Sequence, residues 1–248
     1  MQEKCKCGWV DMDVYDSLLN AVQTEYDTVR CLKKSERGSV SVVRHRQSGE
    51  RFIFRRYQGS GAVYRKLLSV SCPNLPQIME TAERNGHVVV LEELVRGDTL
   101  AFVLEGGTLS TQEARCFAGQ ICQALYVLHT LGAVHRDVKP ENILLRGREA
   151  VLIDFDASRI YHSDAPELTA DTMILGTTGY AAPEQYGMSQ TDPRADIYSL
   201  GVLLNVMLTG EHPSRRLASG RLGRVIRRCT MMSPGQRYQN VLELLGEL

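Results

Sequence analysis

The sequence predicts an α+β fold in which a small antiparallel β-sheet precedes a larger helical part. Up to about residue 93, short runs of apolar and β-branched side chains between turn signals are typical of strands. From Ser110 onward, apolar side chains recur every three or four positions, which is the period of a helix with one buried face. A chain of 248 residues can bury a substantial core, in one domain or in two lobes.

The first part begins with an expected helix at residues 11–26, whose apolar side chains recur at four-residue spacing. Five strands follow, and a helix near residues 60–71 interrupts them. Asn85-Gly86 is a favoured two-residue turn, which predicts that the last two strands form a hairpin. The strand cores are expected at residues 28–32, 40–43, 51–55, 78–81 and 87–91.

The second part is expected to be mostly helical. Ser110 and Glu113 have the spacing of a capping box, which predicts that a helix starts there. The nearly apolar run at residues 197–208 is too short to span a bilayer, so we expect a buried core helix. The last helical pattern ends near Gly246 and is compatible with a domain of a longer protein.

Composition argues against several classes of protein. With 29 basic and 29 acidic residues, the net charge gives no reason to expect binding to nucleic acid or to a membrane surface. Seven cysteines without framework-like spacing are typical of reduced thiols. The N-terminus lacks the apolar core of a signal peptide. We therefore expect a cytoplasmic protein with no membrane contact within this chain.

The most informative pattern is the run at residues 135–142, followed by an Asp-Phe-Asp triplet at residues 154–156. Together they supply two carboxylates, an ammonium group and a carboxamide at fixed spacing. Phosphoryl transfer from a nucleotide uses this set: one carboxylate orients a hydroxyl nucleophile, while an amide oxygen and another carboxylate hold Mg²⁺. The candidate residues are Asp137, Lys139, Asn142 and Asp154.

This pattern resembles the catalytic core of the eukaryotic-type (Hanks-type) protein kinases, and Lys139, two residues after Asp137, is similar to their serine/threonine branch. The resemblance implies a protein-kinase-like bilobal fold, close to the bacterial members with a compact C-terminal lobe. It also implies ATP, Mg²⁺ (or Mn²⁺ in its place), a protein substrate, and a dimer where autophosphorylation occurs. The implied division is an N-terminal helical extension at 1–25, an N-lobe at 26–92, a hinge at 93–98 and a C-lobe at 99–248.

The resemblance implies a role for each candidate in the C-lobe. Asp137 would accept or orient the hydroxyl proton of the protein substrate, and Lys139 would lie beside the γ-phosphate. Asn142 and Asp154 would hold the metal ions through oxygen atoms. Thr177, near the end of the activation segment, would bridge Asp137 and Lys139.

Further expectations concern how the catalytic loop is held. The resemblance implies that Asp196 holds the backbone around His135 from the following helix. It also implies that Glu184, in an Ala-Pro-Glu sequence, forms a buried ion pair with Arg237. His135 and Phe155 are interpreted as packing residues that fix the two loops.

Arg136, next to Asp137, resembles the arginine that binds a phosphothreonine in regulated kinases. Thr169 and Thr172 are the nearest candidates for that modification. The alternative interpretation is that both are solvated loop hydroxyls.

The N-lobe departs from the family pattern. The glycine-rich loop reads Lys-Lys-Ser-Glu-Arg-Gly at residues 33–38, so only Gly38 is kept for close approach of a phosphate. Arg55 replaces the usual lysine and Val63 replaces the usual helix glutamate, so the usual Lys–Glu ion pair is absent. Because a buried charge without a partner is costly, we expect Arg55 to pair with Glu92.

The remaining nucleotide contacts are implied by position. Ile53 stands where the family usually has alanine above the adenine, and its extra methylenes narrow that pocket. Val40 above and Leu144 below would complete the apolar contact. The backbone of Glu93 and Val95 would bond to the adenine.

Asp156 stands where the family has the glycine of Asp-Phe-Gly. An aspartate carries a Cβ atom, so positive φ values are less accessible, although aspartate tolerates them better than most residues. We expect Asp154 to keep its metal-binding role and the movement of the segment to be restricted.

Three functions remain open. The leading one is an ATP- and Mg²⁺-dependent protein serine/threonine kinase, because the side chains that touch the transferring phosphoryl group are all present. The alternative is a pseudokinase that serves as a nucleotide- or protein-binding regulatory module, which Arg55, Ile53 and Val63 favour. A small-molecule kinase of the aminoglycoside or choline type does not explain Lys139 or the Ala-Pro-Glu sequence at residues 182–184.

Overall fold

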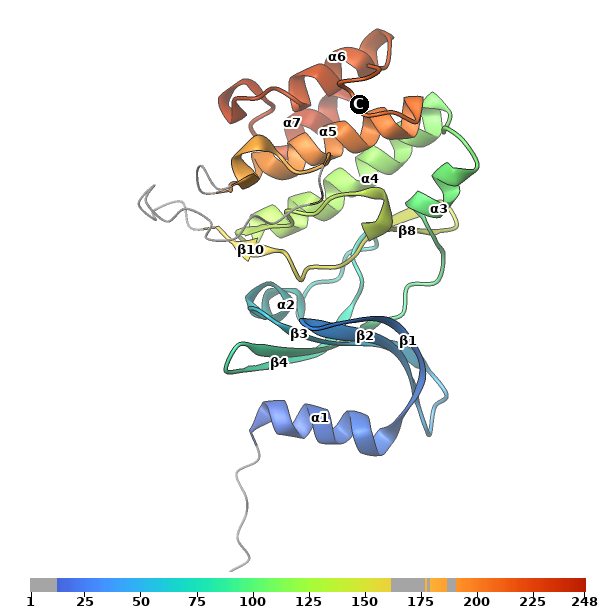
Figure 1. The fold of residues 1–248 in the computed structure, drawn as a ribbon, viewed down its shortest axis with the longest axis vertical. Coiled ribbons are helices and arrows are strands. Elements are labelled where there is room, and N and C mark those ends of the chain that lie inside the picture. Colours follow the sequence, from blue (N-terminus) through green and yellow to red (C-terminus); the bar gives the residue numbers. More distant parts are fainter. Residues whose placement is uncertain (1–12, 162–176, 178, 187–190) are drawn as a thin grey trace, which may run out of the picture. The chain divides into compact units, whose positions relative to one another are not determined.

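The structure, a computed structural model, describes residues 13–161, 177, 179–186 and 191–248 (Figure 1). The chain forms two compact units: residues 1–61 with 79–92 make up unit 1, and residues 62–78 with 93–248 make up unit 2. Unit 1 is built on a five-stranded sheet and unit 2 is mostly helical, so the predicted α+β class is confirmed. The limits of the lobes that the resemblance implied stay a prediction. The implied N-lobe at 26–92 included residues 62–78, whereas in the structure these residues belong to unit 2.

The sheet of unit 1 has the strand order β1-β2-β3-β5-β4. β2 pairs antiparallel with both β1 and β3, and its register with β3 places Val40 opposite Arg55. All five predicted strands are present, and backbone pairing extends several of them beyond their apolar cores. Their bounds are β1 (Tyr26–Ser35), β2 (Gly38–His45), β3 (Arg51–Gln58), β4 (Ile78–Arg84) and β5 (His87–Glu93).

Helix α1 (Val14–Glu25) covers one face of this sheet (Figure 1). Asp13 caps its first turn by accepting a hydrogen bond from the Tyr15 N–H at 3.4 Å. Leu18 of α1 is buried in an apolar cluster that includes Phe54 of β3. Because side chains alternate along a strand, Phe54 faces α1 while Arg55 points to the opposite face of the sheet.

Two tight hairpins shape unit 1. Asn85 and Gly86 have φ values of 51° and 73°, the left-handed values that a two-residue hairpin turn requires. β1 and β2 join through a turn at residues 36–37, so the expected glycine-rich loop is a short hairpin. A Cβ atom on Gly38 would collide with the carbonyl oxygen of Arg56, so the packing of neighbouring strands already requires glycine at this position.

Unit 2 is arranged around helices α4 and α5, which pack against each other (Figure 1). Short strands form two small sheets, β6-β8-β9 and β10-β7. The helices are α2 (Ala62–Leu67), α3 (Leu100–Glu105), α4 (Thr111–Thr130), α5 (Arg194–Thr209), α6 (Gly220–Cys229) and α7 (Val241–Glu247). The short elements are β6 (Asp98–Thr99), β7 (Ala133–Val134), η1 (Pro140–Asn142), β8 (Ile143–Arg146), β9 (Glu149–Leu152), β10 (Arg159–Ile160), η2 (Pro183–Tyr186) and η3 (Pro234–Gln236).

The helix boundaries of unit 2 follow local sequence signals. The predicted capping box is present: the Ser110 hydroxyl accepts from the Glu113 N–H, and the Glu113 carboxylate accepts from the Ser110 N–H. α5 is the buried helix predicted at residues 197–208, and Gly210, whose φ is 74°, caps its C-terminal end. None of the helices in the described part of the chain combines the length and the apolar character needed to cross a bilayer.

Asn205, a fully buried residue of α5, fixes the course of the loop that follows this helix. Its Nδ2 donates to the carbonyl oxygens of Glu211 at 2.7 Å and Arg216 at 2.8 Å. Its Oδ1 accepts from the Ala218 N–H at 2.9 Å. One buried amide therefore holds three backbone groups of residues 211–218.

Candidate active site

Asp196, in the first turn of α5, holds the backbone that leads into the candidate catalytic residues. Its two carboxylate oxygens accept from the N–H groups of His135 at 2.9 Å and Arg136 at 2.8 Å, as the resemblance implied. Arg136 has a φ of 71°, an unfavourable value for a residue with a side chain. A third bond, from Gln185 Nε2 to the Arg136 carbonyl oxygen at 2.8 Å, helps to hold this conformation and so sets the direction of Asp137.

Burial affects the protonation of His135 and Asp196, the two residues that hold this backbone. His135 is fully buried, and desolvation lowers its pKa, so the imidazole is neutral at physiological pH. Its Nδ1 accepts from the Asp137 N–H and its Nε2 faces the Ile153 carbonyl oxygen at 3.2 Å, so the proton belongs on Nε2. Burial acts to raise the pKa of Asp196, but the hydrogen bond from His129 and the nearby charges outweigh burial and hold that pKa below its usual value.

Asp137, Lys139 and Thr177 form a closed triangle of polar contacts. Lys139 Nζ lies 2.7 Å from Asp137 Oδ2 and donates to Thr177 Oγ1 at 2.6 Å. The Thr177 hydroxyl in turn donates to Asp137 Oδ1 at 2.8 Å. Thr177 therefore lies between Asp137 and Lys139, as the resemblance implied. The side chains of Asp137 and Lys139 are 16% and 19% exposed, so both are held in place and still reachable from solvent.

Asn142, at the end of η1, is bonded to the same aspartate. Its Nδ2 donates to the Asp137 carbonyl oxygen and to Asp137 Oδ2, each at 2.9 Å. Both bonds use the nitrogen, which leaves the amide oxygen as the atom that can bind a cation. The Ile153 N–H donates to the Asn142 carbonyl oxygen at 2.9 Å, which brings Asp154 next to Asn142.

These two residues fit the metal that the family implies. An amide oxygen and a carboxylate are hard oxygen ligands of the kind that Mg²⁺ prefers, and Mg²⁺ takes its other ligands from phosphates and water. Across the residues that the structure describes, no group of three or more His, Cys, Asp or Glu side chains forms a separate metal site.

Tyr64 of α2 is a residue of this site that the sequence analysis missed. Its hydroxyl donates to Asp156 Oδ1 at 2.9 Å and accepts from the Phe155 N–H at 3.3 Å. The rings of Tyr64 and His135 both pack edge-on against Phe155, which agrees with a packing role for His135 and Phe155. The available signal was the position of Tyr64 beside Val63, on the helix where the family glutamate is expected.

The backbone of the triplet at residues 154–156 explains how it accommodates an aspartate in place of glycine. Asp154 has a φ of 70°, whereas Asp156 is not among the described non-glycine residues with a positive φ. Asp156 therefore needs none of the conformational freedom of glycine, and its carboxylate instead anchors Tyr64. The unfavourable φ lies on Asp154, two residues before the position where glycine is replaced.

Glu184 and Arg237 form the predicted buried ion pair, which is therefore confirmed. Two parallel hydrogen bonds join the guanidinium to the carboxylate, at 2.6 Å and 2.9 Å. The Arg237 side chain is 0% exposed and that of Glu184 is 8% exposed. Arg237 Nε also donates to the Met231 carbonyl oxygen at 2.8 Å, so the pair ties η2 to the segment after α6.

In unit 1, the predicted pairing of Arg55 with Glu92 is also confirmed. Arg55 Nε donates to Glu92 Oε1 at 2.6 Å, and the two side chains are 6% and 3% exposed. Val63, which stands in place of the family glutamate, is a buried apolar residue of α2.

The other residues predicted to contact the nucleotide in unit 1 lie in neighbouring strands. Gly38 and Val40 belong to β2, and Ile53 belongs to β3 and is 8% exposed. Their roles in binding stay predictions.

The residues predicted to contact adenine in unit 2 lie near the end of β5 and in β8. Glu93 is the last residue of β5, and its carbonyl oxygen accepts from the Val95 N–H at 3.2 Å. Leu144 lies in β8. Their roles also stay predictions, and Thr169 and Thr172 lie outside the described residues.

Comparison with known proteins agrees with this geometry. The protein kinase domain family matches residues 34–240. The chain is 34% identical over 154 residues to the serine/threonine-protein kinase pkn2 of Myxococcus xanthus, a match that covers 60% of this chain and 19% of that protein. It is 35% identical over 168 residues to the probable serine/threonine-protein kinase pknA2 of Bifidobacterium longum, covering 66% of this chain and 21% of that protein.

A third relative is the serine/threonine-protein kinase PknB of Mycobacterium leprae, 35% identical over 147 residues, with 57% of this chain and 24% of that protein covered. The matches thus span only about a fifth to a quarter of the length of these curated relatives. The family match, by contrast, includes most of the chain and all of the catalytic candidates. The chain therefore belongs to the protein kinase domain family, among the bacterial eukaryotic-type kinases that its motifs resemble.

Proposed function

We propose that this chain is the catalytic domain of an ATP-dependent protein serine/threonine kinase. The observation that carries the proposal is the closed network of Asp137, Lys139 and Thr177. A module that only binds nucleotide has no physical need to keep a carboxylate, an ammonium group and a hydroxyl in this arrangement. The similar bacterial proteins are serine/threonine-protein kinases, which supports the proposal. The proposal extends to a protein substrate and to ATP as the partners of the whole protein.

Asp137 would orient the hydroxyl group of the substrate and accept its proton. Two neighbours hold its carboxylate in position: Thr177 donates to Oδ1 and Asn142 donates to Oδ2. Lys139 lies beside Oδ2 and would stabilise negative charge that develops on the transferring group. The contribution of the chain is thus mainly positioning and electrostatic stabilisation, which is what phosphoryl transfer requires.

Asn142 and Asp154 would hold Mg²⁺ through their side-chain oxygens. When bound, Mg²⁺ neutralises phosphate charge and aligns the phosphate chain. We propose that the nucleotide contacts are those identified from the sequence. They are Gly38, Val40, Ile53, Arg55, Glu93, Val95 and Leu144.

We also propose that the protein works in the cytoplasm. The five cysteines within the described residues are all free thiols, which supports a reducing compartment. A dimer that forms for autophosphorylation stays a prediction.

The proposal is tested by giving purified protein ATP labelled at the γ-phosphate, Mg²⁺ and a generic protein substrate, with Asp137→Asn as the control. We expect incorporation into the substrate by the unchanged chain and a loss of about a hundredfold or more in the control. A thermal shift with Mg²⁺ and ATP should be similar in both proteins. A shift without incorporation above the control would overturn the proposal and identify a pseudokinase.

A further inference from the structure

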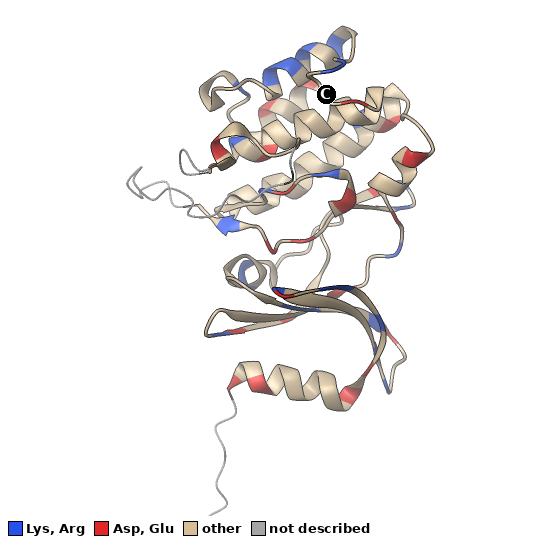
Figure 2. Ribbon diagram, viewed as in Figure 1, with Lys and Arg blue, Asp and Glu red and all other residues tan. Residues whose placement is uncertain are grey.

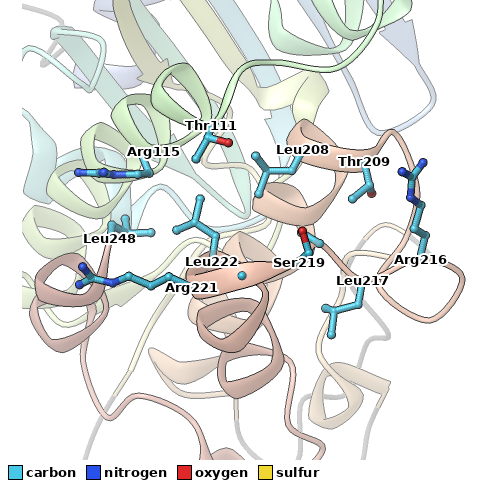
Figure 3. Close-up of a pocket in the computed structure, with 12 residues that line it drawn as sticks. Thr111, Arg115, Leu208, Thr209, Arg216, Leu217, Ser219, Arg221, Leu222 and Leu248 are labelled. Carbon is cyan, nitrogen blue, oxygen red and sulfur yellow. The ribbon is translucent and has the colours of Figure 1, made fainter.

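Unit 2 carries a groove that none of the residues discussed above explains. A pocket of about 500 Å³ is lined by the start of α4, the end of α5 and the start of α6 (Figure 3). A second hollow of about 740 Å³ runs on along α4, and the two share Thr111, Arg115 and Leu248. We call the two hollows together the arginine groove, after Arg115, Arg216 and Arg221, which line it.

The first pocket of the arginine groove is apolar in the middle and cationic on two opposite sides. In Figure 3, Arg115 and Arg221 lie on one side of the pocket and Arg216 lies on the other. Leu208 and Leu222 lie between them. Among the described residues that line the two hollows, no side chain is acidic and none is aromatic.

The local charge is strongly positive although the whole chain is neutral. No Asp or Glu occurs between residues 212 and 242, a stretch that contains seven arginines. Figure 2 shows several basic positions, coloured blue, along the ribbon of α6. Two of the seven have other tasks: Arg237 pairs with Glu184, and Arg228 lies over the Tyr238 ring at 4.1 Å.

The arginines of the groove are exposed and largely unneutralised. Arg115, Arg216 and Arg221 are all exposed to solvent. Within the part of the chain that the structure describes, Arg115 and Arg216 form no ion pair, and Arg221 forms one long, exposed ion pair with Glu247 at 3.9 Å. The backbone that carries Arg216 is held by Asn205, so one end of the groove is preorganised.

We propose that the arginine groove docks an acidic segment of the protein substrate, an inference that rests on the proposed kinase function. Guanidinium groups bind carboxylates through paired hydrogen bonds. The arginine groove offers three guanidinium groups, those of Arg115, Arg216 and Arg221. The leucines between them favour an apolar side chain on the same segment. Single-stranded nucleic acid fits less well because no aromatic side chain lines the groove to stack on bases.

Helix α5 connects the arginine groove to the loop that carries Asp137. Asp196, near its start, holds the loop that carries Asp137, and Thr209, its last residue, lines the groove. Thirteen residues of α-helix rise by about 20 Å. An extended chain covers that distance in about six residues, so the docking segment would be separated from the phosphorylated residue by at least about that number.

The test measures binding without ATP, so that its result does not depend on catalysis. The probe is a short fluorescein-labelled peptide of alternating glutamate and leucine, followed by fluorescence anisotropy. The groove variant combines Arg216→Glu with Arg221→Glu. The matched control combines Arg215→Glu with Arg224→Glu, which makes the same charge change at exposed positions of the same segment outside the groove lining.

We expect binding to weaken by about tenfold or more in the groove variant and by less than about threefold in the control. A peptide with alanine in place of leucine should also bind more weakly. Equal losses in both variants, or no loss in either, would overturn the proposal. Tighter binding of single-stranded DNA or of anionic lipid vesicles would overturn it in favour of those ligands.

A kinetic measurement separates this inference from the proposed function. For a substrate that carries such an acidic segment, the groove variant should raise KM and leave kcat nearly unchanged. Absence of phosphate transfer by the unchanged chain would contradict the kinase function while leaving the binding result intact. Transfer with an unchanged KM would contradict docking alone.

Discussion

Arg55 and Glu92 form a buried ion pair across the neighbouring strands β3 and β5, with 2.6 Å between Arg55 Nε and Glu92 Oε1. Both side chains are more than nine-tenths buried. The usual Lys–Glu pair of the family cannot form, because Arg55 stands in place of the lysine and Val63 in place of the glutamate. The pair with Glu92 takes over and neutralises the buried charge of Arg55. Arginine at this position is therefore integrated into the fold of unit 1.

Removing one partner of this pair should be costly. Glu92→Gln leaves the Arg55 guanidinium with a neutral partner in a buried place, and we expect it to lower the free energy of unfolding by about 3–5 kcal/mol. The double variant Arg55→Met, Glu92→Leu should recover most of that loss, because no buried charge remains. Denaturant titration of the single and double variants measures both effects. A double variant that loses as much stability as Glu92→Gln would contradict the coupling.

Arg55→Lys should lower phosphate transfer even though it restores the residue usual in the family. Lysine is shorter and has no planar guanidinium group, so it cannot reproduce the hydrogen bond to Glu92 in the same geometry. Steady-state kinetics with Mg²⁺ and ATP measures the change. A rise in activity would show that the arginine is a defect and not an integrated part of the fold.

Stability should fall as the pH drops below the ordinary pKa of histidine, because of His135. Burial lowers its pKa in the folded protein, so below about pH 6.5 the unfolded chain binds a proton that the folded chain does not. The stability present above that pH is then lost at up to about 1.4 kcal/mol per pH unit. Denaturant titrations between about pH 7.5 and about pH 5.5 measure the free energy of unfolding on both sides of the ordinary histidine pKa. This free energy should depend less on pH in His135→Gln than in the unchanged chain. Parallel profiles would contradict the neutral buried imidazole.

Asp196 should add a second loss of stability at lower pH. Its folded pKa is depressed, so its contribution is present above the unfolded value of about 3.9 and disappears as the pH falls through the folded value. Asp196→Asn keeps the shape of the side chain and removes this titration. We expect the acid limb of its unfolding profile to be shallower than that of the unchanged chain.

The ion pair of Glu184 with Arg237 should stabilise unit 2 by joining η2 to the segment after α6. Glu184→Gln weakens two short hydrogen bonds to a fully buried guanidinium, and we expect a loss of about 3–5 kcal/mol in the free energy of unfolding. The exposed pair of Asp27 with Arg44 is the control, and Asp27→Asn should leave the unfolding midpoint almost unchanged. Similar shifts of the unfolding midpoint in Glu184→Gln and Asp27→Asn would contradict the claim that burial makes the Glu184–Arg237 pair strong.

Thr177 should act through the position of Asp137 and not through nucleotide binding. Thr177→Val removes the hydroxyl that donates to Asp137 Oδ1 and accepts from Lys139, and we expect kcat to fall about tenfold to a hundredfold. The KM for ATP should change little. Thr177→Ser keeps the hydroxyl and should retain most of the activity, so equal losses in the two variants would contradict this role.

The sequence was sufficient wherever residue type and spacing were both specific. The motifs around Asp137 and Thr177 implied that Thr177 bridges Asp137 and Lys139, and the structure shows this contact, because the chemistry leaves few alternatives at that spacing. The partner of Arg55 was predicted from the cost of a buried charge, a physical rule that needs no pattern. The capping box and the Asn85-Gly86 turn were predicted because they depend on local backbone geometry alone.

The sequence was insufficient where the determinant is a contact between distant segments. The hydrogen bond from Tyr64 to Asp156 joins residues 92 positions apart, and no periodicity links them. The two-residue strands β6, β7 and β10 are too short to show alternation, so only pairing with a neighbouring strand reveals them. The arginine groove likewise depends on helix ends that meet only in the folded chain.

The most direct test of the central claim is a single-turnover measurement of phosphate transfer to a protein substrate, with the modified residue identified by mass spectrometry. With Mg²⁺ and saturating ATP, the account predicts phosphoserine or phosphothreonine, formed at a rate at least about a hundredfold above that of Asp137→Asn. Equal rates in the two proteins, or consumption of ATP with no modified side chain, would contradict it.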